Sequence, residues 1–136
     1  RFNDLSSPVR EGERELRWQG VRPNESGYMN FNAYVGTQDH ALAYALSSVY
    51  SPADQVVYAE LRADNFAQIL VNGRIVEAGQ TFGSPGALIY APITLRRGWN
   101  TLVVKLVNNS GDWWLAFRLA DVKRNLRFAA EPGIRR

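Results

Sequence analysis

The chain has 136 residues, of which 46% are apolar and 21% charged, the balance of one globular domain rather than a disordered segment. It lacks cysteine, which excludes disulfide frameworks, thiolate metal sites and cysteine nucleophiles, and it has a single histidine, His40. No run of about 18 apolar residues is present, so we expect no membrane-spanning helix. The initial arginine and the absence of a signal peptide lead us to expect a mature or excised module.

The formal net charge is +3, but the positive charge is concentrated at the two ends of the chain. Ten of the 16 Lys and Arg residues lie in residues 1–22 and 123–136, whereas eight of the 13 acidic residues lie in 23–122. The body is therefore slightly acidic, which argues against a nucleic-acid partner. The basic flanks either keep linkers soluble or contact an acidic neighbour.

The order of the chain indicates one domain with two flanks. Residues 1–15 mix serine, proline and charge and are expected to form a linker or strap; residues 123–136 form a tail without periodicity. Between them, in the 16–122 module, apolar residues recur mostly with a period of two, which predicts short strands. The expected strands are 28–35, 41–50, 56–63, 67–71, 74–77, 87–95, 100–107 and 113–120.

Turn residues separate these strands. Asn72-Gly73 predicts a type I′ hairpin turn, since both residues tolerate positive φ, and Gly79–Gly86 predicts a loop. About eight strands without a convincing helix indicate an all-β protein, a two-sheet antiparallel β-sandwich. An amphipathic helix around 38–48 is the main competing interpretation.

The stretch from Tyr44 to Asp121 carries a family resemblance. The residues that carry it are Ala43-Tyr44-Ala45, Ala63-Asp64-Asn65, Ile69-Leu70-Val71-Asn72-Gly73, Leu95 to Lys105, Gly111-Asp112-Trp113-Trp114 and Arg118-Leu119-Ala120-Asp121. They resemble the jelly-roll, galactose-binding-like modules appended to bacterial glycoside hydrolases and other exported proteins. This chain has Ala-Asp-Asn where those modules usually have an acidic pair. The resemblance implies a noncatalytic module with an extracellular or periplasmic location, often carbohydrate-binding and sometimes structural.

Two groups of side chains are candidates for binding an uncharged glycan. Tyr28, Asn30, Asn32 and Tyr34 would share one face of the first strand, where tyrosines stack on sugar rings and amides bind hydroxyl groups. An ordinary solvated strand is the alternative.

The second group lies near the end of the module. Alternation predicts that Trp113 is in the core and that Trp114 shares the opposite face with Arg118, with Lys105 on the adjacent strand. Trp114 would then be a stacking platform, or else pack under a flanking segment. Trp99 is a further ligand candidate, although an aromatic at this position in the family commonly covers the sheet edge. Asn100 is expected to be a turn amide that satisfies backbone groups.

Oxygen ligands permit a structural calcium ion, because galactose-binding-like modules often carry one. Asp64, Asp121 and Glu13 are the candidate ligands, although no EF-hand loop is present and Asp64-Asn65 equally suits an Asx cap. No pair of carboxylates, nucleophile elbow or phosphate loop indicates an enzyme. We therefore expect a noncatalytic module that binds a polysaccharide or oligosaccharide beside the other domains of its parent protein, with no nucleic-acid or membrane partner. The alternative is a structural or protein–protein interaction domain.

Overall fold

The computed structural model describes the backbone of residues 9–11, 14–16, 28–31, 40–64, 66–81, 87–108 and 110–129. Side chains are described within these ranges from Tyr28 onward, except for 78–81. The described elements are strands: β1 (Val9–Glu11), β2 (Arg14–Leu16), β3 (Tyr28–Asn30), β4 (Ala41–Ser51), β5 (Gln55–Asp64), β6 (Phe66–Val71), β7 (Arg74–Thr81), β8 (Ile89–Leu95), β9 (Gly98–Asn108), β10 (Trp114–Ala120) and β11 (Arg127–Ala129).

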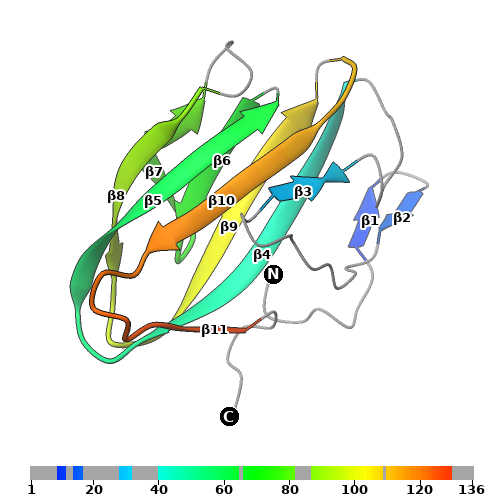
Figure 1. Ribbon diagram of the computed structural model, residues 1–136. Coiled ribbons are helices and arrows are strands. Elements are labelled where there is room, and N and C mark those ends of the chain that lie inside the picture. The colour runs from blue at the N-terminus through cyan, green and yellow to red at the C-terminus, as the bar shows by residue number, and fades with distance from the viewer. Residues whose placement is uncertain are drawn as a thin grey trace.

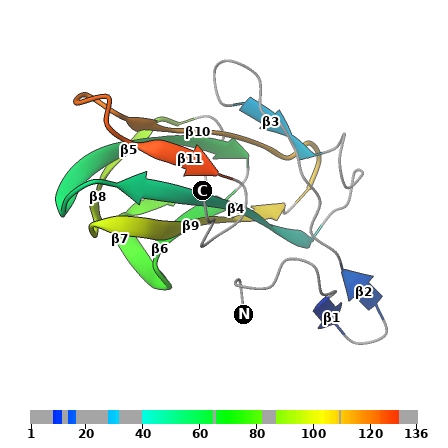
Figure 2. The same ribbon diagram turned by 90° about the horizontal axis from the view of Figure 1, so that it is seen from below.

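Two antiparallel sheets pack against each other, so the predicted all-β two-sheet sandwich is confirmed. One sheet has the order β3-β10-β5-β8 and the other β11-β4-β9-β6-β7, and β1 and β2 form a separate pair (Figure 1). Seen from below, the layer with β3, β10 and β5 lies above the layer with β4 and β9 (Figure 2). Among the described residues, no helix is long and apolar enough to cross a membrane.

The core lies between the sheets and is filled by every second residue of the strands, as the alternation predicts. On β5 the inward residues are Val57, Ala59, Leu61 and Ala63. They are joined by Trp113, only 2% exposed, whose ring centroid lies 5.5 Å from that of Phe31. Trp113 is therefore a core residue, as predicted.

Residues 41–51 form an interior strand, so the competing helix at 38–48 is wrong. β4 pairs with β9 along its whole length, from Ala41 opposite Asn108 to Ser51 opposite Gly98. Its sequence is apolar on both sides because the inner face packs on the core, while Leu42 and Leu46 lie on an outer face that is also apolar. Alternation is weak wherever both faces of a strand are apolar.

The Asn72-Gly73 turn joins β6 and β7, with φ of 51° and 83° as a type I′ turn requires. β7 continues to Thr81, so residues 79–81 of the expected Gly79–Gly86 loop belong to a strand, and residues 82–86 lie outside the described residues. Asn100 is 1% exposed, and its amide bonds backbone groups of Arg96 as well as the side chain of Asn72, which confirms the predicted turn amide.

The two flanks contain strands that alternation does not predict. The expected linker holds β1 and most of β2, and the expected tail provides β11 at the edge of the five-stranded sheet. Asp121 stabilises the turn before β11, since its carboxylate oxygens accept hydrogen bonds from the amides of Asn125 (3.1 Å) and Leu126 (3.2 Å). The Arg127 guanidinium then lies 4.5 Å from the ring centroid of Tyr50 on β4.

Candidate functional site

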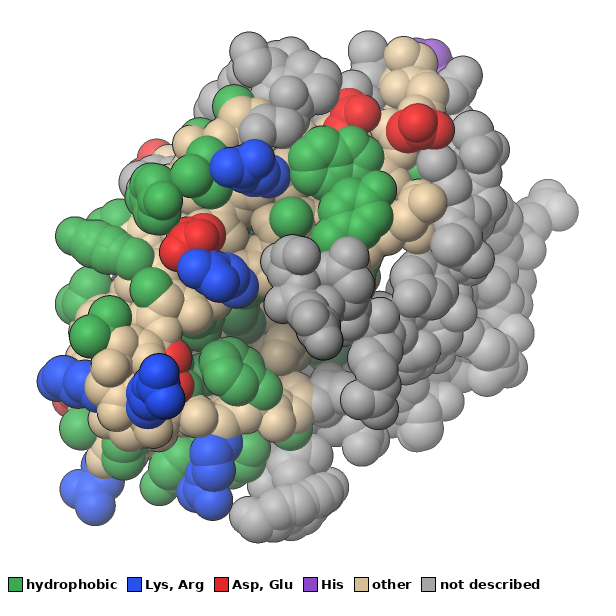
Figure 3. Space-filling view, in the orientation of Figure 1, with side chains coloured by type: hydrophobic (Ala, Val, Ile, Leu, Met, Phe, Trp, Pro, Cys, Tyr) green, Lys and Arg blue, Asp and Glu red, His purple; other side chains and the backbone are tan. Residues whose placement is uncertain are grey.

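The outer surface of the four-stranded sheet, here called the β10 face, gathers most of the described candidate residues. Because Trp113 and Leu115 point into the core, the intervening residues of β10 point outward. The β10 face consists of Tyr28 and Asn30 on β3, Trp114, Ala116 and Arg118 on β10, Tyr58, Glu60, Arg62 and Asp64 on β5, and Tyr90 on β8. Apolar, basic and acidic side chains alternate across this side of the molecule (Figure 3).

An aromatic pair occupies one end of the β10 face. The ring centroids of Tyr28 and Trp114 are 5.6 Å apart, and the two planes are inclined by 33°. Tyr28 is 37% exposed and Trp114 is half-buried, so the pair is partly open to solvent. Asn30 lies directly opposite Trp114 on β3 and is exposed. The arrangement offers an apolar surface of two tilted rings with an amide at its edge.

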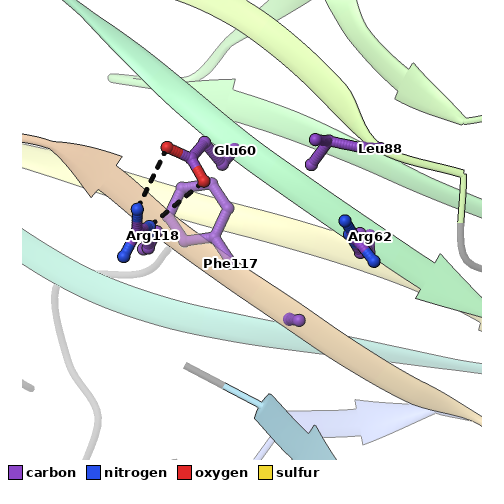
Figure 4. Close-up of a pocket in the computed structure, with 6 residues that line it drawn as sticks. Glu60, Arg62, Leu88, Phe117 and Arg118 are labelled. Atoms are coloured by element: carbon purple, nitrogen blue, oxygen red, sulfur yellow. Dashed lines mark hydrogen bonds and ion pairs between the residues drawn. The ribbon is translucent and has the colours of Figure 1, made fainter. Parts of the chain in front are cut away.

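A small residue and a set of charges adjoin this pair. Ala116 stands directly between Tyr28 on β3 and Arg62 on β5. Two residues further along β10, Arg118 binds Glu60 through two hydrogen bonds, Nε to Oε1 at 3.1 Å and Nη2 to Oε2 at 3.4 Å (Figure 4). A shallow, open depression of about 200 Å³ lies here, lined by Ala116, Arg62, Arg118, Glu60, Leu88 and Phe117.

The structure brings four of the predicted ligand residues onto one face: Tyr28, Asn30, Trp114 and Arg118. Trp114 shares its face with Arg118, as alternation predicts, and contacts Tyr28 from a strand more than 80 residues earlier in the chain. Asn32 and Tyr34, which were expected to continue the row on the first strand, lie outside the described residues.

Lys105 lies in the other sheet, so its predicted place beside Trp114 is wrong. It pairs with Tyr44 on β4 and with Gln68 on β6. The chain crosses from one sheet to the other between β9 and β10, instead of folding back as a hairpin. A connection of about five residues reaches a facing sheet about 10 Å away as easily as a paired strand about 4.8 Å away, so its length does not decide between the two.

Trp99 also lies in the five-stranded sheet, away from the β10 face. It stands opposite Tyr50, with ring centroids 5.5 Å apart and planes at 65°. The guanidinium of Arg127 contacts the same tyrosine ring. The Trp99–Tyr50 contact joins β9 to β4, two neighbouring strands inside the sheet, and separates Trp99 from the other ligand candidates.

The candidate calcium ligands are not brought together. Asp64 is paired with Trp114 at one end of β10, and Asp121 follows the other end, about 20 Å away at the usual rise per residue. These two carboxylates cannot share an ion, and Glu13 lies outside the described residues. In the part of the chain that the structure describes, no three acidic, histidine or cysteine side chains gather as metal ligands.

The chemistry of the β10 face is thus an open aromatic pair, a small floor residue, an amide and two guanidinium groups. No protein-family model, curated protein or solved structure shows a significant match to the chain.

Sequence reasoning overlooked four residues of the β10 face: Tyr58, Glu60, Arg62 and Tyr90. The alternation of β5 does predict that Glu60 and Arg62 point outward, away from Leu61. It does not predict that Arg62 stands beside Ala116 or that Tyr90 stands beside Glu60, because these neighbours follow from the sheet order. A search for outward cations on every predicted strand would have included Arg62.

Proposed function

We propose that the protein is a noncatalytic carbohydrate-binding module that holds a polysaccharide or oligosaccharide on the β10 face. The observation that supports this most directly is the Tyr28–Trp114 pair, partly open to solvent and adjoined by the small side chain of Ala116. A pyranose ring has an apolar face that stacks on aromatic rings, and it can approach them only where the neighbouring side chains are small. Two partly open aromatic rings beside an alanine meet both needs.

Hydrogen bonds would provide selectivity for the sugar. Asn30 offers a donor and an acceptor beside Trp114, and Arg118 offers guanidinium N–H groups that its bond to Glu60 holds in place. A site built to bond hydroxyl groups rejects analogues that lack them, since its polar groups then lose their partners. No covalent step is required in this proposal.

We place the module in a larger exported protein, on the basis of its resemblance to galactose-binding-like modules. Its role would be to hold the other domains of the parent protein near a polysaccharide, which raises their effective concentration on that substrate. The arrangement of the β10 face suits such a role because an open sheet surface leaves both ends of a long glycan chain free.

The test is the affinity of Trp114→Ala for a panel of soluble polysaccharides, measured by affinity gel electrophoresis. A stacking energy of about 1 kcal/mol or more predicts a loss of affinity of roughly 5-fold or more for the glycan that the unmodified protein binds. Trp99→Ala is the matched control, since it also removes a half-buried indole beside a tyrosine, but on the other sheet. The control should bind as the unmodified protein does.

Two results would contradict the proposal. Equal losses of affinity in Trp114→Ala and Trp99→Ala would show that the β10 face is not the site. Ready unfolding of Trp114→Ala, with a melting temperature far below that of Trp99→Ala, would show that Trp114 supports the core rather than a ligand.

A docking role is the second candidate, and the outer face of the five-stranded sheet favours it. On this face Leu42 (47% exposed) and Tyr44 (43% exposed) lie on β4, and Ile75 (50% exposed) lies on β7, with β9 and β6 between the two strands. Exposed apolar side chains on a sheet suit a neighbouring domain or subunit. Light scattering on the isolated chain distinguishes the two roles, since self-association without glycan binding supports docking and a glycan-binding monomer supports the first proposal.

A further inference from the structure

Arg62 is an exposed cation near the centre of the β10 face. Within the described ranges its side chain makes no hydrogen bond and no ion pair. The neighbouring cation, Arg118, is by contrast bound to Glu60 through both of that residue's carboxylate oxygens. The face therefore holds one guanidinium that is committed to a partner and one that is available to a ligand.

The register of the sheet places Arg62 across a gap from the aromatic pair. Tyr28 and Arg62 are both paired with Ala116, so their strands are separated by the single strand β10. At the usual strand spacing their backbones lie about 10 Å apart, with only a methyl group between them. A pyranose ring resting over Ala116 would contact Tyr28 and Trp114 on one side and the Arg62 guanidinium on the other.

The charged side chains near Arg62 limit how an anion can approach it. Arg62 and Arg118 lie on the adjacent strands β5 and β10, and the Glu60 carboxylate points toward Arg118 (Figure 4). Glu60 is thus directed away from Arg62. Asp64 and Glu60 lie two residues from Arg62 on either side along β5, so a carboxylate would reach Arg62 from the side of Ala116, between the two acidic residues.

We propose that the bound sugar is a uronate, whose carboxylate is held by Arg62 while its ring stacks on Tyr28 and Trp114. This inference rests on the proposed function. A guanidinium binds a carboxylate through two parallel N–H···O bonds, which are stronger than bonds to hydroxyl groups. The carboxylate of a hexuronate projects from the ring edge and leaves the stacking face apolar. Its shape therefore matches an aromatic surface with a cation at the rim.

The experiment compares polygalacturonate and polymannuronate with their carboxyl-reduced, neutral forms, by isothermal titration calorimetry on the full chain. We expect the unmodified protein to bind a uronate polymer at least 10-fold more tightly than its neutral form. The Arg62→Gln variant should bind the uronate polymer with an affinity about 10-fold lower or more, and its affinity for the neutral polymer should change little. Arg74→Gln, which removes an exposed cation from β7, is the matched control and should change neither affinity.

The outcomes separate this inference from the proposal beneath it. Equal binding of acidic and neutral polymers, unaffected by Arg62→Gln, would overturn the uronate assignment and leave a glycan site in place. Equal affinity for a sulfated galactan, with the same dependence on Arg62, would overturn the choice of a carboxylate. Failure of the unmodified protein to bind any polymer of a broad glycan panel would overturn the proposed function itself.

Discussion

Replacing Asn100 should destabilise the fold more than replacing most other polar residues, although Asn100 is far from any ligand candidate on the β10 face. Its Oδ1 accepts hydrogen bonds at 2.9 Å from the Arg96 amide and from Nδ2 of Asn72. Its Nδ2 donates to the carbonyls of Arg96 (2.9 Å), Gly98 (3.1 Å) and Val49 (3.3 Å). One side chain thus joins the turn before β9, the β6–β7 turn and strand β4.

The cost of Asn100→Ala follows from these contacts. Each buried hydrogen bond contributes about 1 kcal/mol net, and buried groups left without a partner cost about 1–3 kcal/mol. Because water can reach part of the turn and replace some of these bonds, we expect the free energy of unfolding to fall by about 3–4 kcal/mol. In a chain of this size that lowers the melting temperature by roughly 10–15 °C. A domain with a total stability of about 5–15 kcal/mol loses a large share of it.

The assay is thermal and urea denaturation followed by circular dichroism, with Asn30→Ala as the matched control. Asn30 is an exposed asparagine on the other sheet, so its replacement should change the stability by less than about 0.5 kcal/mol. Similar melting temperatures for the Asn100→Ala and Asn30→Ala variants would refute the reasoning.

Asn100→Asp adds a pH signature to this prediction. The substitution keeps the Oδ1 acceptor but turns an ionisable oxygen toward three carbonyls, which favours the neutral acid and raises the pKa of the new carboxyl above its unfolded value. The folded state then binds more protons than the unfolded state, so stability falls as the pH rises above about 4. Urea midpoints measured relative to the unmodified protein should therefore diverge more at pH 7 than at pH 4, and a constant difference would contradict the assignment.

Two further predictions concern the core and the tail. Trp113→Ala should lower the free energy of unfolding by about 3–5 kcal/mol, because it opens a cavity beside Phe31. Urea denaturation should show a much smaller loss of stability for Trp114→Ala, and equal losses would contradict the difference in burial between the two residues. Asp121→Ala should cost about 1–2 kcal/mol and speed amide hydrogen exchange at Leu126 and along β11, since it removes two acceptors; unchanged exchange there would show that the cap does not hold the strand.

The sequence predicts most of the strands because their inner and outer faces differ chemically. From Val57 to Ala63 on β5 every second residue is buried, so its alternation is visible without a structure. The Asn72-Gly73 turn is equally visible, since its positive φ values demand those residue types. The role of Asn100 follows from the turn chemistry around Gly98. These features are local, and local signals are what a single sequence records best.

Features that depend on sheet order are not visible in the same way. Alternation assigns Lys105 to a face of its own strand but not to a sheet, and the crossover between β9 and β10 places it away from Trp114. β11 has only three residues and an exposed Phe128, and contacts made far along the chain, such as Arg127 with Tyr50, hold it in place. No periodicity can predict a strand of that kind.

The β10 face and the core are coupled through the register of β10. Trp113 and Leu115 point inward while Trp114 and Ala116 point outward, so a slip of one residue against β5 would bury Trp114 and expose Trp113. The burial of Trp113 therefore holds the ligand candidates in place, although it contributes no atom to the face. Because the face consists of paired strands rather than a mobile loop, a glycan would bind it with little loss of backbone freedom, and its affinity would depend on the contacts themselves. For the same reason, a substitution beneath the face should weaken binding in proportion to the fraction of protein it unfolds.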